Sequence, residues 1–446
     1  MSATMTTQFG AAPLHSKDAI DATLKKVAWR LIPFLFFCYV LNFIDRINIG
    51  YSQLQMKQEL GFTDAVYGLG AGLFFIGYFT FEVPSNLMLE KIGARKTILR
   101  IMLLWGLTSA ATMFVVTPVQ YYVARSFLGV FEAGFFPGIM LYLTYWFPAG
   151  HRARIVALFM TAVVIAGLAA GPISGWILKD MNGVHGLQGW QWMFLLEGLP
   201  SSLFGIALYL YLDDRPKDAK WLTPVEKEIV IHNLEADKKV ADVSRHNRLG
   251  QTFSDPKLFL LAFVHFAITC GGFLISFWMP TIIRELGVTD LLQIGLYATI
   301  PYGIAGIAMV LWARHSDAKL ERRWHFAAPA LIGALALGLT TVISGNFWVS
   351  MLLLTVATAG LIAPLPVFWA ISTAYLSQTA AAAGIAIITS IGNLSGFVSP
   401  YVIGSIKTST GSTTIGIYLM TAVVVAGVLS LLVGVPPRMV HEREEN

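Results

Sequence analysis

The sequence is poor in charged residues and in cysteine. Only 13% of its 446 residues are Asp, Glu, Lys or Arg, whereas soluble domains carry about a quarter. The hydrophobic share of 56% exceeds what a soluble core can bury, which excludes an ordinary soluble protein. Cys38 and Cys270 both fall in apolar runs and provide no disulfide framework. Residues 1–16 lack the basic start and short apolar stretch of a removable signal peptide, so we expect the first membrane helix to direct insertion.

Long apolar runs dominate the chain instead. A helix of about 20 apolar residues crosses a hydrocarbon layer of about 30 Å, and runs of this length recur up to residue 436. They are continuous rather than alternating, which argues against a transmembrane barrel. We expect twelve membrane helices, at roughly 28–49, 64–89, 97–116, 119–144, 155–177, 190–212, 257–283, 291–314, 325–345, 348–373, 382–404 and 413–436.

The basic residues predict the orientation of these helices. If both termini face the cytoplasm, 25 of the 31 Lys and Arg residues fall on the cytoplasmic side, as short cytoplasmic loops require. This asymmetry explains the net charge of +5 without a nucleic-acid partner. The sequence therefore predicts a multi-pass inner-membrane protein with the lipid bilayer as its surroundings and both termini in the cytoplasm.

The chain divides into two similar halves around a charged linker. The predicted segments are a tail (1–27), a six-helix bundle (28–212), the linker (213–256), a second bundle (257–436) and a second tail (437–446). Glu90 after the second helix matches Asp317 after the eighth, 227 residues later, and Pro172 matches Pro400, 228 residues later. A near-constant offset between independent landmarks indicates an internal repeat.

The loop after the second helix resembles the loop signature of the major facilitator superfamily. An acidic residue at a helix end is followed by a basic turn with glycine, and the loop after the eighth helix repeats the pattern. Such an acid can pair with basic residues and helix ends and so latch one conformation. We expect a gating role for Glu90, Lys91, Gly93, Arg95, Lys96, Arg314 and Asp317.

Seven stretches resemble the anion:cation symporter family within that superfamily. They are NFIDRINIG, VPSNLMLEKIGARK, RSFLGVFEAGFFPG, YWFPAGHRAR, GWQWMFLLEGLP, LDDRPKDAKWLT and SIGNLSGFVSPYVIG, and they span both halves and the linker. The resemblance implies an all-α fold of twelve transmembrane helices in two pseudo-symmetric six-helix bundles. It also implies uptake of organic anions such as tartrate, phthalate, sugar acids or hydroxyphenylacetate together with protons. We expect a monomer without a cofactor or a metal.

Ionisable residues at membrane depth are functional candidates because each is expensive to bury. Arg125 and Glu132 are two helical turns apart and share one face of their helix. Asp45 and Arg46 are adjacent and point about 100° apart, so we expect Asp45 to pair with Arg125 and Arg46 with Glu132. The complete set is Asp45, Arg46, Glu82, Arg125, Glu132, Glu197 and His265.

The predicted mechanism is competition for the two arginines. Protonation of a carboxylate frees an Arg, whose planar fork suits a substrate carboxylate, so proton and anion favour each other's binding. The family resemblance implies that Asp45 and Glu132 are the proton sites and that Arg46 and Arg125 bind the anion. A static charge network between the helices is the alternative. For Glu82 and Glu197 we expect a structural role at helix ends, and for His265 a satisfied or partly solvated histidine.

The second half and several neighbouring side chains should shape the substrate site. The resemblance places a substrate contact at Asn393, an uncharged donor and acceptor among small residues. Aromatic and hydroxyl side chains elsewhere are candidates as well, with core packing as the alternative for the aromatics. The further candidates are Tyr39, Asn42, Tyr78, Trp278, Trp369 and Ser372.

Other function classes find little support in the sequence. No metal-ligand or nucleophile cluster suggests an enzyme, and neither the polar rings of a channel nor a signalling appendage is present. Exchange or uniport without protons is the remaining rival. Two arginines suit a dicarboxylate, but if one arginine pairs only with Asp45 the substrate is a monocarboxylate. The aromatic residues of the second-half helices favour an aromatic monocarboxylate such as hydroxyphenylacetate.

Overall fold

The computed structural model describes residues 16–244, 255–343, 345–375 and 381–435, which form helices and connecting turns. The first half contains α1 (Lys17–Ile47), α2 (Ile49–Leu60), α3 (Asp64–Ile92), α4 (Ala94–Ala111), α5 (Pro118–Glu132), α6 (Phe135–Thr144), α7 (Ala149–Met160), α8 (Ala162–Asp180) and α9 (Gly189–Tyr211). The second contains α12 (Pro256–Glu285), α13 (Leu291–Lys319), α14 (Arg323–Leu339), α15 (Phe347–Ile362), α16 (Leu365–Tyr375), α17 (Ala381–Asn393), α18 (Ser395–Thr410) and α19 (Thr414–Gly434).

Eleven helices among the described residues are long and apolar enough to span a membrane. Five of them combine two consecutive helices, so that α1–α2, α5–α6, α7–α8, α15–α16 and α17–α18 each form one span. The ninth predicted span corresponds to α14, an apolar helix of 17 residues. The all-helical prediction is confirmed, with one of the twelve expected spans shorter than the others.

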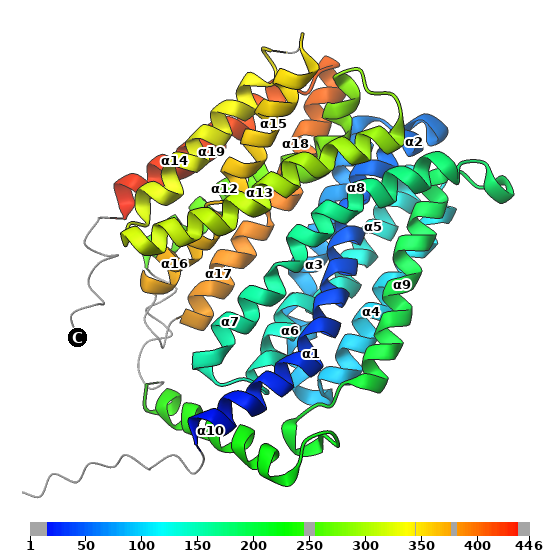
Figure 1. Ribbon diagram of the computed structural model, residues 1–446. Helices are drawn as coiled ribbons and strands as arrows, with labels where there is room; N and C mark the ends of the chain where they lie inside the picture. Colours follow the sequence, from blue (N-terminus) through cyan, green and yellow to red (C-terminus); the bar gives the residue numbers. More distant parts are fainter. Residues whose placement is uncertain (1–15, 245–254, 344, 376–380, 436–446) are drawn as a thin grey trace, which may run out of the picture.

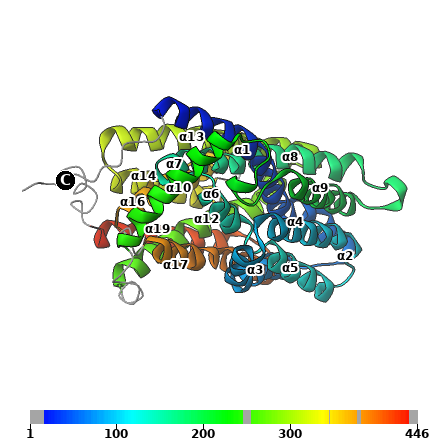
Figure 2. The ribbon, with the colours of Figure 1, turned by 90° about the horizontal axis from the view of Figure 1, so that it is seen from below.

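The two sets of helices lie side by side (Figure 1). Helices α1 to α9 occupy one side and α12 to α19 the other, while α10 (Pro224–Ser244) crosses beneath the start of α1. Figure 2 shows α10 lying across the helix ends. Helix α2 is at the opposite end, and we call these two ends the α10 end and the α2 end. The predicted segment boundaries remain a prediction.

The two halves meet at the α2 end. Helix α8 touches α13 where a Cβ on Gly295 would lie 2.0 Å from the Gly171 carbonyl oxygen, a distance that only glycine permits. Tyr67 and Gln53 both donate to the Phe277 carbonyl at 3.0 Å. Within the described ranges, the hydrogen bonds and ion pairs that join the halves all lie between the middle of the molecule and the α2 end. The structure is therefore closed at the α2 end.

An exposed ion pair ties α10 to α1. The Lys26 ammonium lies 2.9 Å from the Glu226 carboxylate, and Glu226 also accepts from the Thr223 backbone N–H. The hydrogen bond from Lys26, followed by that from Thr223, lowers the pKa of Glu226. The linker helix is thus anchored to the first membrane helix.

Candidate functional site

Three polar residues lie where membrane helices are interrupted. Glu132 is the last residue of α5, before a break at Gly134 with φ +87°. Asn48 separates α1 from α2, and Asn393 ends α17. Interrupted helices bring backbone and side-chain polar groups to membrane depth, where they are tolerated only inside the protein.

Arg46 and Glu132 form an ion pair between α1 and α5, as the sequence predicts. Glu132 is fully buried, and its second oxygen, Oε2, is buried without a hydrogen-bond partner among the described residues. The Arg46 guanidinium carbon also lies 5.3 Å from the Phe74 ring centroid and 5.4 Å from that of Tyr78. Tyr78 is therefore next to the predicted anion-binding residue.

Arg125 is buried and has no polar partner in the described part of the chain. Its side chain is 1% exposed, and none of its three nitrogens has a hydrogen-bond partner there. Its guanidinium carbon lies 5.2 Å from the Phe74 ring centroid. Helices α3 and α5 can approach closely because Gly129 has no side chain. A Cβ on Gly129 would lie 1.9 Å from the Phe74 carbonyl oxygen. A guanidinium with five unsatisfied N–H donors in such a place needs an acceptor.

Asp45 does not pair with Arg125, contrary to the sequence prediction. Trp105 Nε1 donates to Asp45 Oδ2 at 2.8 Å, Asn48 Nδ2 donates to Oδ1 at 3.1 Å, and the Ser109 hydroxyl also donates to Oδ1. Both oxygens are thus occupied by neutral donors, and Asp45 is 1% exposed. The prediction failed because an apolar run gives no sign that a Trp and a Ser one turn apart will face an acid on another helix.

Two further first-half candidates lie near this cluster. The Tyr39 ring stacks on Phe159 with centroids 4.7 Å apart, and its interaction with Arg46 and Glu132 indicates proximity to the ion pair. Asn42 is 1% exposed, and neither its Oδ1 nor its Nδ2 has a hydrogen-bond partner among the described residues. Asn42 therefore retains its full capacity to bind another group.

The predicted site residues of the second half lie in two separate regions of the structure. The His265 ring lies 5.1 Å from the Trp369 ring, and a Cβ on Gly392, next to Asn393, would meet His265 Nδ1 at 1.9 Å. His265 is 6% exposed and its Nδ1 is without a partner within the described ranges, and the expectation of a satisfied or partly solvated histidine stays a prediction. Ser372 is also buried with an unpartnered hydroxyl there. His265 on α12 and Ser372 on α16 thus each have a polar group available for a ligand.

Trp278 belongs to the closed α2 end. Its ring meets Tyr67 edge-on with centroids 5.3 Å apart, and the Lys407 ammonium lies 5.4 Å from its centroid. Tyr67 in turn donates to the Phe277 carbonyl across the two halves. In this conformation Trp278 therefore takes part in closing the molecule.

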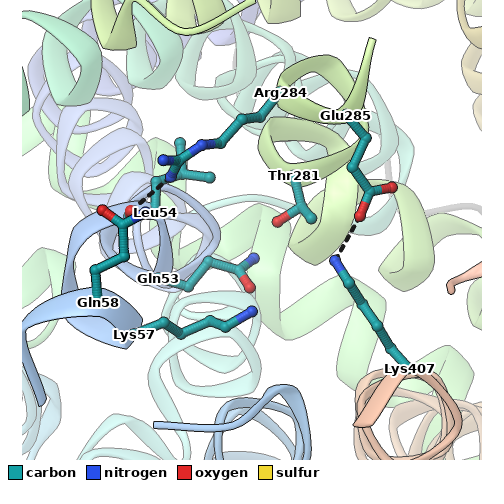
Figure 3. A pocket seen from close by; sticks show the side chains of 8 residues that line it. All are labelled: Gln53, Leu54, Lys57, Gln58, Thr281, Arg284, Glu285 and Lys407. Atoms are coloured by element: carbon teal, nitrogen blue, oxygen red, sulfur yellow. Dashed lines mark hydrogen bonds and ion pairs between the residues drawn. The ribbon is translucent and has the colours of Figure 1, made fainter. Parts of the chain in front are cut away.

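A pocket of about 290 Å³ opens at the α2 end between α2, α12 and α18 (Figure 3). Lys407 lies 2.6 Å from Glu285 within the second half and 3.8 Å from Asp64 across the halves. Arg284 donates to the Leu54 carbonyl at 2.7 Å. The lining residues are Gln53, Leu54, Lys57, Gln58, Thr281, Arg284, Glu285 and Lys407, with three cations against one acid. Lys57 pairs with Asp64, which lies beside this lining, so Asp64 and Glu285 offset two of the three cations.

The residues predicted to gate lie at the α10 end. Arg95 donates to the Tyr209 carbonyl at 2.6 Å, and its backbone N–H donates to Asp214 at 2.9 Å. A Cβ on Gly93 would meet Asp214 at 2.9 Å, and Gly93 has a φ of +92°. Asp317 pairs with Arg322. The other predicted gating residues, Glu90, Lys91, Lys96 and Arg314, are exposed.

Glu82 and Glu197, the two acids predicted to have structural roles, differ in burial. Glu82 is half-buried near the end of α3. Glu197 is 5% exposed, with Ser174 Oγ donating to its Oε1 at 2.7 Å and no described partner for Oε2. A buried carboxyl with one empty oxygen is more than a helix-end contact.

A family model described as Major Facilitator Superfamily matches residues 35–400. The chain belongs to this superfamily. The match covers most of both predicted bundles, and it makes the protein a multi-pass membrane transporter rather than an enzyme.

Two sequence relatives align with this chain over nearly its full length. NicT of Pseudomonas putida, provisionally named a metabolite transport protein, is 42% identical over 97% of this chain and 99% of its own. A protein of Agrobacterium vitis, provisionally named a tartrate transporter, is 43% identical over 94% of this chain and 96% of its own. These relatives support the resemblance to organic anion transporters.

Solved structures confirm the major facilitator fold. A D-xylose-proton symporter aligns with a TM-score of 0.73 at 16% identity, over 92% of this chain and 98% of its own. A bacterial homologue of the human lysosomal transporter Spinster, in an inward-facing conformation, aligns with a TM-score of 0.70 at 17% identity, over 96% and 97%.

Proposed function

We propose that this transporter imports a small carboxylate anion together with protons, by alternating access. The observation that supports it most is Arg125, which is buried at membrane depth with no acceptor in the described part of the chain. An unpaired buried charge costs several kcal/mol, so its retention indicates a ligand that compensates it. A carboxylate fits the guanidinium fork with two parallel hydrogen bonds.

Proton coupling follows from the second arginine. Arg46 is occupied by Glu132 in this structure, so it is available to an anion only after Glu132 takes up a proton. The proton neutralises Glu132 and frees Arg46, and the anion then binds between Arg46 and Arg125 beside Phe74. Each ligand raises the affinity for the other by the same factor. Asp45, which accepts three hydrogen bonds, is the second proposed proton site.

The side of entry follows from the charge distribution. Because Lys and Arg concentrate in the loops at the α10 end, we assign this end to the cytoplasm. The structure, closed at the α2 end, is then the inward-facing conformation. When the α2 end opens, the cations Lys57, Arg284 and Lys407 on the outer side outnumber their neighbouring acids Asp64 and Glu285 and raise the local concentration of anions. Gating at the α10 end is assigned to Glu90, Arg95 and Asp317 with their neighbours.

The substrate class rests on two arginines that face the same ring. Two guanidinium groups suit a dicarboxylate such as tartrate, the compound in the name of the Agrobacterium relatives. Trp369 next to His265 favours an aromatic monocarboxylate such as hydroxyphenylacetate as the second candidate. Asn393, Asn42 and Ser372 would then bind hydroxyl groups or a second carboxylate.

A thermal-shift screen of organic acids tests the substrate class. We expect tartrate or another small carboxylate to raise the melting temperature of the purified protein, because a ligand that binds only the folded state stabilises it. The shift should disappear in Arg125→Gln and persist in Arg154→Gln, which changes an exposed arginine. Stabilisation of both variants alike by the same acid would contradict the assignment of Arg125 to the anion.

A further inference from the structure

The pocket at the α2 end contains two buried polar atoms without a partner in the described part of the chain. They are Gln53 Oε1 and Thr281 Oγ1, on residues that are 2% and 7% exposed, and both residues line the pocket. Figure 3 shows their side chains directed into it from opposite halves of the molecule. A buried polar atom that stays unpaired is costly, so each atom favours a ligand group that completes its hydrogen bonds.

The Gln53 amide has a fixed orientation. Its Nε2 donates to the Phe277 carbonyl of the other half at 3.0 Å and to the Gly50 carbonyl at 3.2 Å. Because both of these partners are acceptors, the amide nitrogen must face them, and Oε1 remains as an acceptor. A ligand at this point therefore needs a donor such as a hydroxyl group. The Thr281 hydroxyl can serve as donor or acceptor.

Arg284 gives the pocket its excess of positive charge. The two lysines in the lining each pair with an acid. Arg284 instead donates to the Leu54 carbonyl at 2.7 Å, and among the described residues no carboxylate pairs with it. A guanidinium has five N–H donors in a planar fork, so most of them remain for an anion. The pocket thus combines a cation, an acceptor and a hydroxyl around one space.

We propose that this pocket is a second anion site, which binds a small hydroxycarboxylate while the α2 end is closed. The carboxylate accepts from Arg284 and Thr281, and a hydroxyl of the ligand donates to Gln53 Oε1. The volume of about 290 Å³ is at the lower end of the range for small-molecule sites, roughly 300–1,000 Å³, which favours a small acid. This inference rests on the proposed anion transport and adds a site outside the Arg46–Arg125 cluster.

The site exists only while the two halves are together. Gln53 belongs to α2 of the first half, whereas Thr281 and Arg284 belong to α12 of the second. A ligand that binds one conformation more tightly shifts the population toward it. An anion in this pocket therefore opposes opening of the α2 end, and a high external concentration of the anion should slow its own uptake.

Binding should be weaker here than in the central cluster. One guanidinium replaces the two of Arg46 and Arg125, and exposed residues such as Gln58 and Glu285 form part of the lining, so water competes for the ligand. The pocket should therefore fill only at anion concentrations above those of the thermal-shift screen. At such concentrations the two sites can be separated by disabling the central one.

Saturation-transfer NMR of the full-length Arg125→Gln protein measures this weaker site. We expect tartrate to bind, and succinate, which has the same carbon chain without hydroxyl groups, to bind about tenfold or more weakly because Gln53 Oε1 then stays unpaired. Absence of tartrate binding would overturn the proposal. Equal dissociation constants for tartrate and succinate would overturn the hydroxyl contact and with it the assigned ligand class.

Two further variants in the same protein locate the ligand. Arg284→Gln should raise the dissociation constant for tartrate about tenfold or more, since a charge-assisted hydrogen bond is lost. Lys179→Gln is the matched control, because Lys179 also joins the halves, through Asp290, but lies outside the pocket lining. An equal loss in Lys179→Gln would show that Arg284 only supports closure, and an unchanged constant in Arg284→Gln would place the anion elsewhere.

Removal of one hydroxyl group provides a second test. Thr281 has no hydrogen-bond partner among the described residues, so Thr281→Val should weaken tartrate binding without loosening the halves. Thr80→Val, on the exposed side of α3, should bind tartrate like the parent protein. If Thr281→Val bound tartrate like Thr80→Val, the anion would not occupy this pocket. These measurements need no pH gradient, so uptake that ignores the gradient would refute the proposed function and leave this site to be judged separately.

Discussion

Arg46 and Arg125 both lie against the ring of Phe74, with guanidinium carbons 5.3 and 5.2 Å from its centroid, yet among the described residues only Arg46 has a carboxylate partner. The two guanidinium groups come from different helices, α1 and α5, and Arg125 is 1% exposed, whereas the Arg46 side chain is 17% exposed. This asymmetry is the basis of the proposed order of events. Arg125 can bind the anion directly, whereas Arg46 can bind it only after Glu132 is protonated.

Substitution of Arg125 by Lys should weaken anion binding although the positive charge remains. An ammonium is a point charge and cannot form two parallel hydrogen bonds with a carboxylate. Loss of one charge-assisted hydrogen bond, worth roughly 1.5–3 kcal/mol, corresponds to a decrease in affinity of about tenfold to 100-fold. Titration calorimetry with the acid found by the thermal-shift screen measures the change. Arg154→Lys is the control, and equal affinities of Arg125→Lys and the wild type would exclude a bidentate contact.

Substitution of Glu132 by Gln should remove the pH dependence of anion binding. Gln mimics the protonated acid and leaves Arg46 available at every pH. Wild-type affinity should fall as pH rises because Glu132 then recaptures Arg46, whereas the affinity of Glu132→Gln should stay constant. In liposomes this variant should exchange labelled for unlabelled substrate but should no longer accumulate it under a pH gradient. Parallel pH profiles in both proteins would count against Glu132 as a coupling site.

Closure at the α2 end should fail when a methyl group is placed between α8 and α13. A Cβ on Gly295 would lie 2.0 Å from the Gly171 carbonyl, and backbone cannot yield at that distance. Gly295→Ala should therefore favour the conformation that is open at the α2 end. Gly272→Ala is the matched control, since a Cβ on Gly272 meets nothing within 4 Å. Both changes replace helical Gly by Ala and should not weaken the helices themselves.

Distances between spin labels at Glu59 and Ser412, on opposite halves at the α2 end, report this closure. Both positions are exposed. We expect a longer distance in Gly295→Ala and the wild-type distribution in Gly272→Ala. If the Gly295→Ala distribution matched the wild type, the close contact between α8 and α13 would not control the α2 end.

Acidification should release α10 from α1. Because the pKa of Glu226 is lowered in the folded protein, its pairing with Lys26 stabilises the contact above the ordinary pKa of Glu, about 4.3. That stabilisation is lost as the pH falls through the lowered pKa. Spin labels at Asp18 on α1 and Glu228 on α10 should show a narrow distance distribution at neutral pH and a broader one in acid below the lowered pKa of Glu226. Glu226→Gln should be broad at both, and a narrow distribution in this variant would assign the anchoring to other contacts.

Much of the fold was predictable because the membrane imposes simple constraints. Span lengths follow from bilayer thickness, and the start of α3 at Asp64 and of α5 at Pro118 lies within one residue of the expected boundary. The first span was harder to predict, since α1 begins at Lys17 and α2 continues to Leu60, beyond the apolar run at both ends. Polar and charged helical turns at a membrane surface carry no hydropathy signal.

The site was only partly predictable for a different reason. Helical spacing placed Arg125 and Glu132 on one face and led to the correct Arg46–Glu132 pair. It could not reveal that Trp105 and Ser109 hold Asp45, because contacts between α1 and α4 depend on how those helices are rotated. The same limit assigned Glu197 to a helix end, whereas in the structure its buried carboxyl accepts a hydrogen bond from Ser174 on α8.

Uptake into liposomes under an imposed pH gradient tests the central claim most directly. Protein reconstituted with the acid selected by the thermal-shift screen should accumulate that acid when the outside is more acidic. It should cease to do so when the gradient is abolished or when Arg125→Gln is used. Accumulation that proceeds equally with and without the gradient would contradict proton-coupled import and favour exchange or uniport.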